Sequence, residues 1–367
     1  MYRFFMPTEM LVGEISENSE RLKSTGTKAL IVTGKSSKKN GSLTDMVNAL
    51  KKEGISYVIF DRIEENPSIE NVFDAAQIGR KEKVDFLIGI GGGSPMDAAK
   101  AISVLVKNPE LMGEALMDGN SYPYYPVIAV PTTAGTGSEV TPYAVLTVHA
   151  KETKTSISQQ IFPVISFLNP KYMEDLPLKV TLSTAVDAFT HLMEGYFSTK
   201  ANFLSDKIAE GGFRGFRECM SELKSGNISL ETREKLSIIS SIAGILISQT
   251  GTSFPHGMGY SLTYNKNVAH GFANNVFTKS YLKLCQRTMA EKVSELLKIL
   301  GFETIEEIGN FFNSLIDIDI TITNEEIEQY AEGFFANKAK LRNHPAEVSL
   351  EDVKGLYFES LKDYIAN

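Results

Sequence analysis

Short apolar runs alternate with stretches of helical spacing along the first half of the chain. Four runs rich in valine, isoleucine and phenylalanine have the length of buried strands. We expect strands at residues 29–33, 56–60, 86–90 and 127–130, and helices at 43–52, 69–81 and 95–106. Near-continuous apolar strands separated by helices are typical of a parallel sheet that is covered on both faces. Such a sheet binds its ligands beyond the carboxyl ends of its strands.

The pattern changes near residue 178, where long helical periods replace the short apolar runs. Few strand signals remain, and Pro170 and Pro177 interrupt the chain just before the change. Helices are expected at residues 181–198, 203–225, 230–250, 273–301, 303–315, 324–338 and 350–366. The sequence therefore predicts two domains. Residues 1–177 form a Rossmann-like, dinucleotide-binding α/β domain, and residues 178–367 form an all-helical, metal-binding domain.

Three consecutive glycines follow the third expected strand, in the segment IGIGGGSPMDAAK. They allow the backbone to approach a ligand closely, and Ser94 and Pro95 are good first residues for the helix that follows. The free N–H groups and the positive dipole end of such a helix suit a pyrophosphate. The order is neither GxGxxG nor a Walker loop, so a plain strand-to-helix turn is the alternative interpretation.

A second polar loop, PTTAGTGSEVTPY, follows the fourth expected strand. It places the hydroxyl groups of Thr132, Thr133 and Ser138 among flexible glycines. Such groups can hydrogen-bond a ribose, an adenine edge or a phosphate. Loops of this composition are common, so it is the position at a strand end that favours nucleotide binding.

The loop after the first expected strand, VTGKSSKKNGS, is basic. Gly34 is followed by Lys35, Ser36, Ser37, Lys38 and Lys39. An acid near this place would hold a ribose 2′-hydroxyl, whereas basic and hydroxyl residues accommodate a 2′-phosphate. This composition favours NADP over NAD. A solvated basic loop is the alternative interpretation.

A candidate metal site lies in the second half of the chain. Asp187 and His191 are spaced i, i+4, which projects both side chains from one face of a helix. His256 and His270 lie further along, each followed by glycine in one stretch with few charges. Carboxylate and imidazole together suit Fe²⁺ or Zn²⁺. The other two of the five histidines, at positions 149 and 344, are predicted to lie at the surface.

Composition and charge exclude several classes of protein. The net charge of −8 does not fit a broad nucleic-acid interface, which needs clustered basic residues. No apolar stretch has the length of a membrane span, and no signal peptide is evident. Cys219 and Cys285 lie far apart and outside any CxxC pattern, which fits a reducing cytoplasm. The sequence leaves the oligomeric state open, with a homodimer as one option.

Four motifs in order resemble those of the iron-containing (group III) alcohol dehydrogenase family: GGGSPMDAAK, PTTAGTGSEVTPY, TAVDAFTHLMEGYFS and FPHGMGYSLTYNKNVAHGFANN. The resemblance covers nearly the whole chain. It implies the fold shared with dehydroquinate synthase-like proteins, an α/β domain followed by a helical domain with the site in the cleft between them. It also implies NAD or NADP as the hydride carrier and a bound Fe²⁺, with Zn²⁺ as the alternative.

The resemblance assigns roles to individual residues. The implied metal ligands are Asp187, His191, His256 and His270. The implied cofactor-binding residues are Asn66, Gly92, Gly93, Ser94, Asp97, Thr132, Thr133, Ser138 and Lys154.

The activity that follows is reversible hydride transfer between a small alcohol and its aldehyde or ketone. A related metal- and NAD-dependent lyase or synthase of the dehydroquinate synthase-like superfamily is one alternative, and a non-catalytic nucleotide-binding protein is another. Many family members carry a histidine, often suspected in proton relay, where this chain has Tyr260. Tyr260 is therefore the candidate for a catalytic side chain, and the route by which the alcohol proton leaves stays open.

Overall fold

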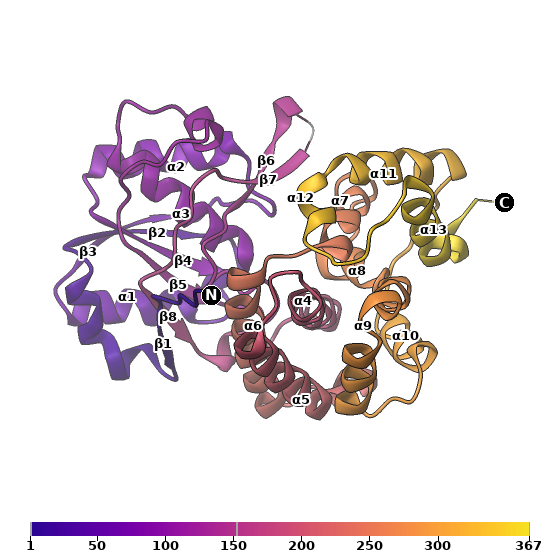
Figure 1. Cartoon of the computed structure of the whole chain (residues 1–367). Coiled ribbons are helices and arrows are strands. Elements are labelled where there is room, and N and C mark those ends of the chain that lie inside the picture. The colour runs from indigo at the N-terminus through magenta and orange to yellow at the C-terminus, as the bar shows by residue number, and fades with distance from the viewer. Residues whose placement is uncertain (1, 152, 367) are drawn as a thin grey trace. The chain divides into compact units, whose positions relative to one another are not determined.

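The computed structural model describes residues 2–151 and 153–366 (Figure 1). The described chain divides into two compact units. One is the α/β unit, Phe5–Leu176, and the other is the helical unit, which runs from Pro177 onward and includes residues 2–4.

A six-stranded parallel sheet forms the centre of the α/β unit. The strand order is β1-β8-β5-β4-β2-β3. The strands are β1 (Glu9–Val12), β2 (Lys28–Thr33), β3 (Ser56–Phe60), β4 (Phe86–Gly91), β5 (Val127–Pro131) and β8 (Ile165–Leu168). The four predicted strands are confirmed as β2, β3, β4 and β5. The prediction missed β1 and β8, which have only four residues each, too few for a periodic signal.

Helices cover both faces of this sheet, because alternate side chains of each strand point to opposite sides. Leu30 and Val32 of β2 pack in one core cluster with α2 (Ile69–Glu82) and α3 (Gly93–Lys107). Ala29 and Ile31 pack in a second cluster with α1 (Ser42–Lys52) (Figure 1). The carboxyl ends of β2, β4 and β5 thus open onto the three loops that were predicted to bind a nucleotide.

The α/β unit also contains an antiparallel pair of strands, β6 (Val145–Val148) and β7 (Thr153–Ser156), which was not predicted. Thr147 of β6 pairs with Lys154 of β7. The N–H group of Thr147 donates to the carbonyl of Pro67 at 2.9 Å, which ties the pair to the loop after β3.

The helical unit contains ten α-helices among the described residues. They are α4 (Leu178–Tyr196), α5 (Phe203–Ser225), α6 (Leu230–Thr250), α7 (Phe254–Lys266), α8 (His270–Asn275), α9 (Thr278–Leu300), α10 (Ile305–Asn313), α11 (Asn324–Ala336), α12 (Lys338–Arg342) and α13 (Leu350–Leu361). The seven expected helices are confirmed, and all of them except α4 begin at a capping residue or end at a glycine that the pattern marks. Asn202 caps α5 and Ser229 caps α6 through side-chain oxygens that accept backbone N–H groups.

The helices α7 and α8 were not predicted, because their glycine-rich sequences lack the regular apolar spacing that indicates a helix. Gly271 in α8 allows this helix to pack very closely on α4. A Cβ atom at position 271 would lie 1.8 Å from the carbonyl oxygen of Ser183, so only glycine fits. The close packing of α8 on α4 is what brings His270 to Asp187.

No single helix in the described parts of the chain has the length and hydropathy that a membrane span requires. The helices α6 and α7 reach these values only when taken together, across a bend of 111°.

Candidate metal and cofactor sites

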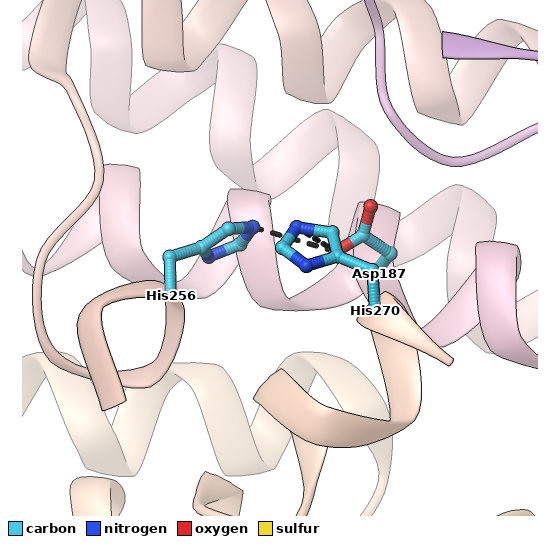
Figure 2. A group of neighbouring side chains, drawn as sticks. All are labelled: Asp187, His256 and His270. Atoms are coloured by element: carbon cyan, nitrogen blue, oxygen red, sulfur yellow. Dashed lines mark ion pairs between the residues drawn. The ribbon is translucent and has the colours of Figure 1, made fainter. Parts of the chain in front are cut away.

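Three of the four predicted metal ligands meet in the helical unit. Asp187 comes from α4, His256 from the first turn of α7, and His270 from the start of α8 (Figure 2). One ligand atom from each residue lies within 4.8 Å of the other two. Asp187 and His256 are buried, whereas the side chain of His270 is 34% exposed. The cluster therefore has one side from which a small molecule can approach.

The donor atoms fit a divalent transition metal. The Oδ1 atom of Asp187 lies 3.4 Å from Nε2 of His256 and 3.9 Å from Nε2 of His270. Two ligands of one tetrahedral metal, each bonded at about 2.1 Å, are separated by about 3.4 Å. The Nε2 atom of His256 is buried and has no hydrogen-bond partner. Such an atom costs free energy unless a group such as a metal uses its lone pair.

His191 lies one turn after Asp187 on α4 and next to this cluster. Its ring stacks on that of His256, with centroids 4.3 Å apart and an angle of 19° between the planes. His191 is not a member of the group of three donors that lie within 4.8 Å of one another. The structure thus places it beside the other candidate ligands without bringing its nitrogen atoms into the same group.

The charges of the cluster are strongly coupled. Burial opposes ionisation of Asp187, but His191 and His270 outweigh this effect and hold its pKa below the usual range. Burial, together with the neighbouring His256, lowers the pKa of His191 to about 4. His256 behaves oppositely: burial favours its neutral form, yet Glu194 and Asp187 raise its pKa to about 9.

Two residues beside the cluster were not predicted. Glu194 lies seven residues after Asp187 on α4, is fully buried, and faces Nδ1 of His256. The side-chain amide of Asn274 donates to Oδ1 of Asp187 at 3.0 Å and lies 3.1 Å from Nε2 of His270. The spacing of Asp187, His191 and Glu194 at i, i+4 and i+7 was the signal that could have revealed the glutamate.

Tyr260 lies at the partly exposed side of the cluster. Its ring is parallel to that of His270 within 19°, and the centroids are 5.7 Å apart. Tyr260 is thus a neighbour of a candidate metal ligand, as its position in the motif suggested.

His344 was predicted to lie at the surface, and this prediction was wrong. It is 4% exposed, and its Nε2 lies 3.3 Å from Sγ of the buried Cys285. Its Nδ1 accepts a hydrogen bond from the N–H group of Ala346. The turn before α13 is therefore folded into the core of the helical unit. His149 is exposed, as predicted.

In the α/β unit, the predicted cofactor residues Asn66, Ser94 and Lys154 come from three segments that are tied together. The N–H group of Asn66 donates to Oγ of Ser94 at 3.1 Å. The carbonyl of Asn66 accepts a hydrogen bond from Thr147, whose strand partner is Lys154. Burial lowers the pKa of the Lys154 ammonium. The start of α3, the loop after β3 and the β6–β7 pair thus form one continuous surface.

The glycine turn and the threonine loop also pack on each other. A Cβ atom at Gly92 would lie 3.3 Å from Oγ1 of Thr133, and one at Gly93 would lie 2.9 Å from the side chain of Thr136. Thr132 donates its N–H group to the carbonyl of Gly91 at 2.8 Å. The glycines therefore allow two loops at neighbouring strand ends to approach each other closely.

Asp97 and Ser138 lie in a buried polar network that the sequence did not reveal. Oγ of Ser138 donates to Oδ1 of Asp97 at 2.5 Å, and the N–H group of Val145 donates to Oδ2 at 2.9 Å. Lys100, fully buried one turn further on α3, donates to Oγ of Ser138 at 2.8 Å and to the carbonyl of Tyr143 at 2.7 Å. These contacts fasten the threonine loop to α3.

In the basic loop after β2, only some of the residues that were predicted to accommodate a 2′-phosphate are exposed to solvent. Ser36 and Lys35 are exposed and Gly34 is half-buried. Ser37 is fully buried, and its hydroxyl contacts Oγ1 of Thr33 at 2.6 Å. Lys38 forms an ion pair with Asp61, which follows β3.

Comparison with known proteins covers both units. Residues 7–170 match the sequence model of the iron-containing alcohol dehydrogenases. Residues 181–361 match the model of the C-terminal domain of the same family. Together the two matches span nearly the whole chain.

Individual relatives agree with these matches. An NADPH-dependent butanol dehydrogenase from Clostridium saccharobutylicum is 30% identical over 89% of this chain and 83% of its own length. An NAD-dependent methanol dehydrogenase from Bacillus methanolicus is 28% identical over 82% of this chain and 80% of its own length. The crystal structure of an iron-containing alcohol dehydrogenase from Thermotoga maritima has a TM-score of 0.92 at 37% identity, covering 99% of this chain and 100% of that one. The predicted fold class is confirmed.

Proposed function

The chain belongs to the iron-containing alcohol dehydrogenase family of oxidoreductases, and we propose that it interconverts a small alcohol with its aldehyde or ketone, using a bound metal and preferring NADP. The observation that carries the proposal is the meeting of donor atoms from Asp187, His256 and His270, among which the buried Nε2 atom of His256 makes no hydrogen bond. Such an arrangement is stable when a metal uses the three donors.

We assign the metal to Asp187, His191, His256 and His270, with Fe²⁺ as the first choice and Zn²⁺ as the alternative. The ring of His191 stacks on that of His256, which supports its assignment beside the other three residues. A bound metal supplies Lewis-acid polarisation of the substrate oxygen. The chain itself supplies the positions of the donors, the packing of α7 and α8 that excludes water from one side, and the half-exposed face beside His270 and Tyr260.

We assign the cofactor to the carboxyl edge of the sheet. The backbone of Gly92 and Gly93 and the first turn of α3 suit the pyrophosphate. Asn66, Ser94 and Lys154 form the tied surface next to it, and Thr132 and Thr133 line the adjoining loop. Asp97 and Ser138 support this loop from behind. The nicotinamide carries the hydride, and these residues orient it.

The preference for NADP rests on the loop after β2. Lys35 and Ser36 are exposed there, and no acid occupies the positions from Gly34 to Lys39. The ion pair of Lys38 with Asp61 reduces the positive charge that Lys38 offers, so Lys35, Ser36 and Lys39 remain the main groups for a 2′-phosphate. The relatives include both NADPH- and NAD-dependent enzymes. The ratio of kcat/KM for NADPH and NADH, in the native protein and in Lys35→Ala, tests this preference.

The activity is tested by oxidation of NADPH with a panel of small aldehydes, with and without added Fe²⁺ or Zn²⁺. We expect metal-dependent turnover in the native protein and none in His256→Ala, which should still bind NADPH. His149→Ala is the matched control, because His149 is exposed and lies in the α/β unit. Turnover that survives in His256→Ala would overturn the proposal. Cofactor binding without turnover on any substrate would favour a non-catalytic nucleotide-binding protein instead.

We also propose that the enzyme works in the cytoplasm, because Cys219 and Cys285 are both free thiols buried in the helical unit. Its other partners would be small molecules only: we propose no nucleic-acid or membrane partner, and a homodimer as the assembly to test by light scattering.

A further inference from the structure

The carboxylate of Glu194 is the most completely enclosed acidic group near the metal site. Its residue is fully buried on α4. Oε1 accepts the backbone N–H groups of Ser253 at 2.8 Å and His256 at 3.2 Å. Oε2 lies in close contact with Nδ1 of His256. One carboxylate therefore binds both the backbone at the start of α7 and the imidazole of His256.

We propose that Glu194 is a positioning residue that fixes the orientation and the tautomer of His256. The proposal rests on the proposed metal-dependent function, since its purpose is to present Nε2 of His256 to the metal. Glu194 itself contacts neither metal nor substrate.

Hydrogen-bond capacity determines which ring nitrogen of His256 carries the hydrogen. An ionised carboxylate can only accept hydrogen bonds, so the ring nitrogen that faces it must carry a hydrogen. When the imidazole of His256 is neutral, its single N–H is therefore on Nδ1, and Nε2 keeps a free lone pair. This lone pair is directed to the side of the ring where Asp187 lies 3.4 Å away.

The backbone contacts make the arrangement rigid. Because Oε1 is bound to two N–H groups of α7, the carboxylate cannot rotate away from Nδ1 without leaving both of them unpartnered in the core. A histidine ligand whose other nitrogen donates to a carboxylate is a common arrangement in metal sites, and its loss typically reduces metal affinity about 10- to 100-fold. The i, i+7 spacing places Asp187 and Glu194 on one face of α4, so this helix holds His256 from both sides.

The decisive variant is Glu194→Gln. The glutamine oxygen can still accept the two backbone N–H groups, but its NH₂ group would then face Nδ1. This nitrogen would have to become an acceptor, which moves the ring hydrogen to Nε2 and blocks ligation. We expect the affinity for Zn²⁺ and Fe²⁺, measured by competition with a chromophoric chelator, to fall about 10- to 100-fold. The chelator-treated variant should still unfold in one cooperative transition, at a lower temperature than the native protein, because a buried pair has lost one of its charges.

Ser280→Ala is the matched control, because Ser280 carries a buried hydroxyl of the same unit that is hydrogen-bonded to Ser360 and to the carbonyl of Phe277, neither of which is a candidate ligand. It should bind metal as the native protein does. Native metal affinity in Glu194→Gln would overturn the inference. A fall in affinity in a chelator-treated variant that no longer unfolds cooperatively would also overturn it, since Glu194 would then maintain the fold and not the orientation of one side chain.

A measurement on the native protein is independent of whether the variant folds. The ¹⁵N shifts of the His256 ring in the zinc-loaded protein should show a hydrogen on Nδ1 and none on Nε2. The reverse assignment would overturn the inference. Absence of metal binding and turnover in the native protein would instead refute the proposed function, so the two failures are distinguishable.

Discussion

Tyr260 lies parallel to His270, with the two ring centroids 5.7 Å apart. We expect this stacking to hold the half-exposed His270 in place. Tyr260→Ala should weaken metal binding about 2- to 10-fold, the range of an aromatic pair, whereas Tyr260→Phe should bind metal normally. Chelator competition measures both. If Tyr260→Phe binds metal normally but loses turnover, the hydroxyl group takes part in proton transfer. If Tyr260→Ala binds metal as the native protein does, the stacking is irrelevant.

Gly271 is the point at which α8 touches α4. Gly271→Ala would force a methyl group against the carbonyl of Ser183, and the two helices would have to separate. We expect the unfolding free energy to fall by about 1–3 kcal/mol, the usual cost of overpacking, and metal affinity to fall with it because His270 moves away from Asp187. Gly211→Ala serves as the control, because a Cβ atom there meets nothing within 4 Å. Denaturant unfolding and metal titration of both variants test this expectation.

Asp97 compensates the buried charge of Lys100, whose Nζ lies 3.5 Å from its Oδ1. Asp97→Asn would remove the main counter-charge of the ammonium, to which Glu139 contributes less, and breaking a buried pair in this way costs about 3–5 kcal/mol. The threonine loop should loosen from α3, so the Kd for NADPH should rise while metal affinity stays unchanged. Fluorescence titration with NADPH measures the first effect and chelator competition the second. An unaltered Kd together with unaltered stability would contradict this account of the loop.

His344 should make the stability of the protein depend on pH. Burial lowers its pKa to about 4 from an ordinary value of 6.5. Between these two values the unfolded chain binds a proton that the folded protein does not, so the unfolding free energy should fall as pH decreases from 6.5 to 4 and level off below. The difference corresponds to about 3 kcal/mol. His344→Gln should lack this component when unfolding is measured at several pH values. Parallel pH curves for native and variant would refute the expectation.

The sequence was sufficient to predict a helix or strand wherever one local signal dominates, such as a continuous apolar run or a helix cap. The apolar runs of β2 and β4 are buried on both faces, so their pattern is continuous, and α5 and α6 carry clear caps at Asn202 and Ser229. Glycine-rich segments gave no period, which is why α7 and α8 were missed although they carry His256 and His270. Their helical state depends on packing against α4, where glycine permits contact.

The site was predictable as a set of chemical groups but not as a set of contacts. Asp187, His256 and His270 were identified by residue type and spacing, and the structure places them together. The side chains that orient these residues can come from far along the sequence: Glu194, which faces His256, lies 62 positions before it. Asp97 and Lys100 lie within one motif, yet only the fold reveals that they contact each other and the loop at Ser138.

The hydrogen bond from Asn66 to Ser94 has a consequence for how a dinucleotide would be received. With Thr147 holding the carbonyl of Asn66 as well, three chain segments are fixed during folding, and the entropy of ordering them is lost at that stage. A ligand that arrives at this edge of the sheet meets a preorganised surface, and its interaction energy is not spent on arranging loops. Selectivity at this surface is therefore set by complementarity of shape and charge, more than by the capacity of the protein to adapt.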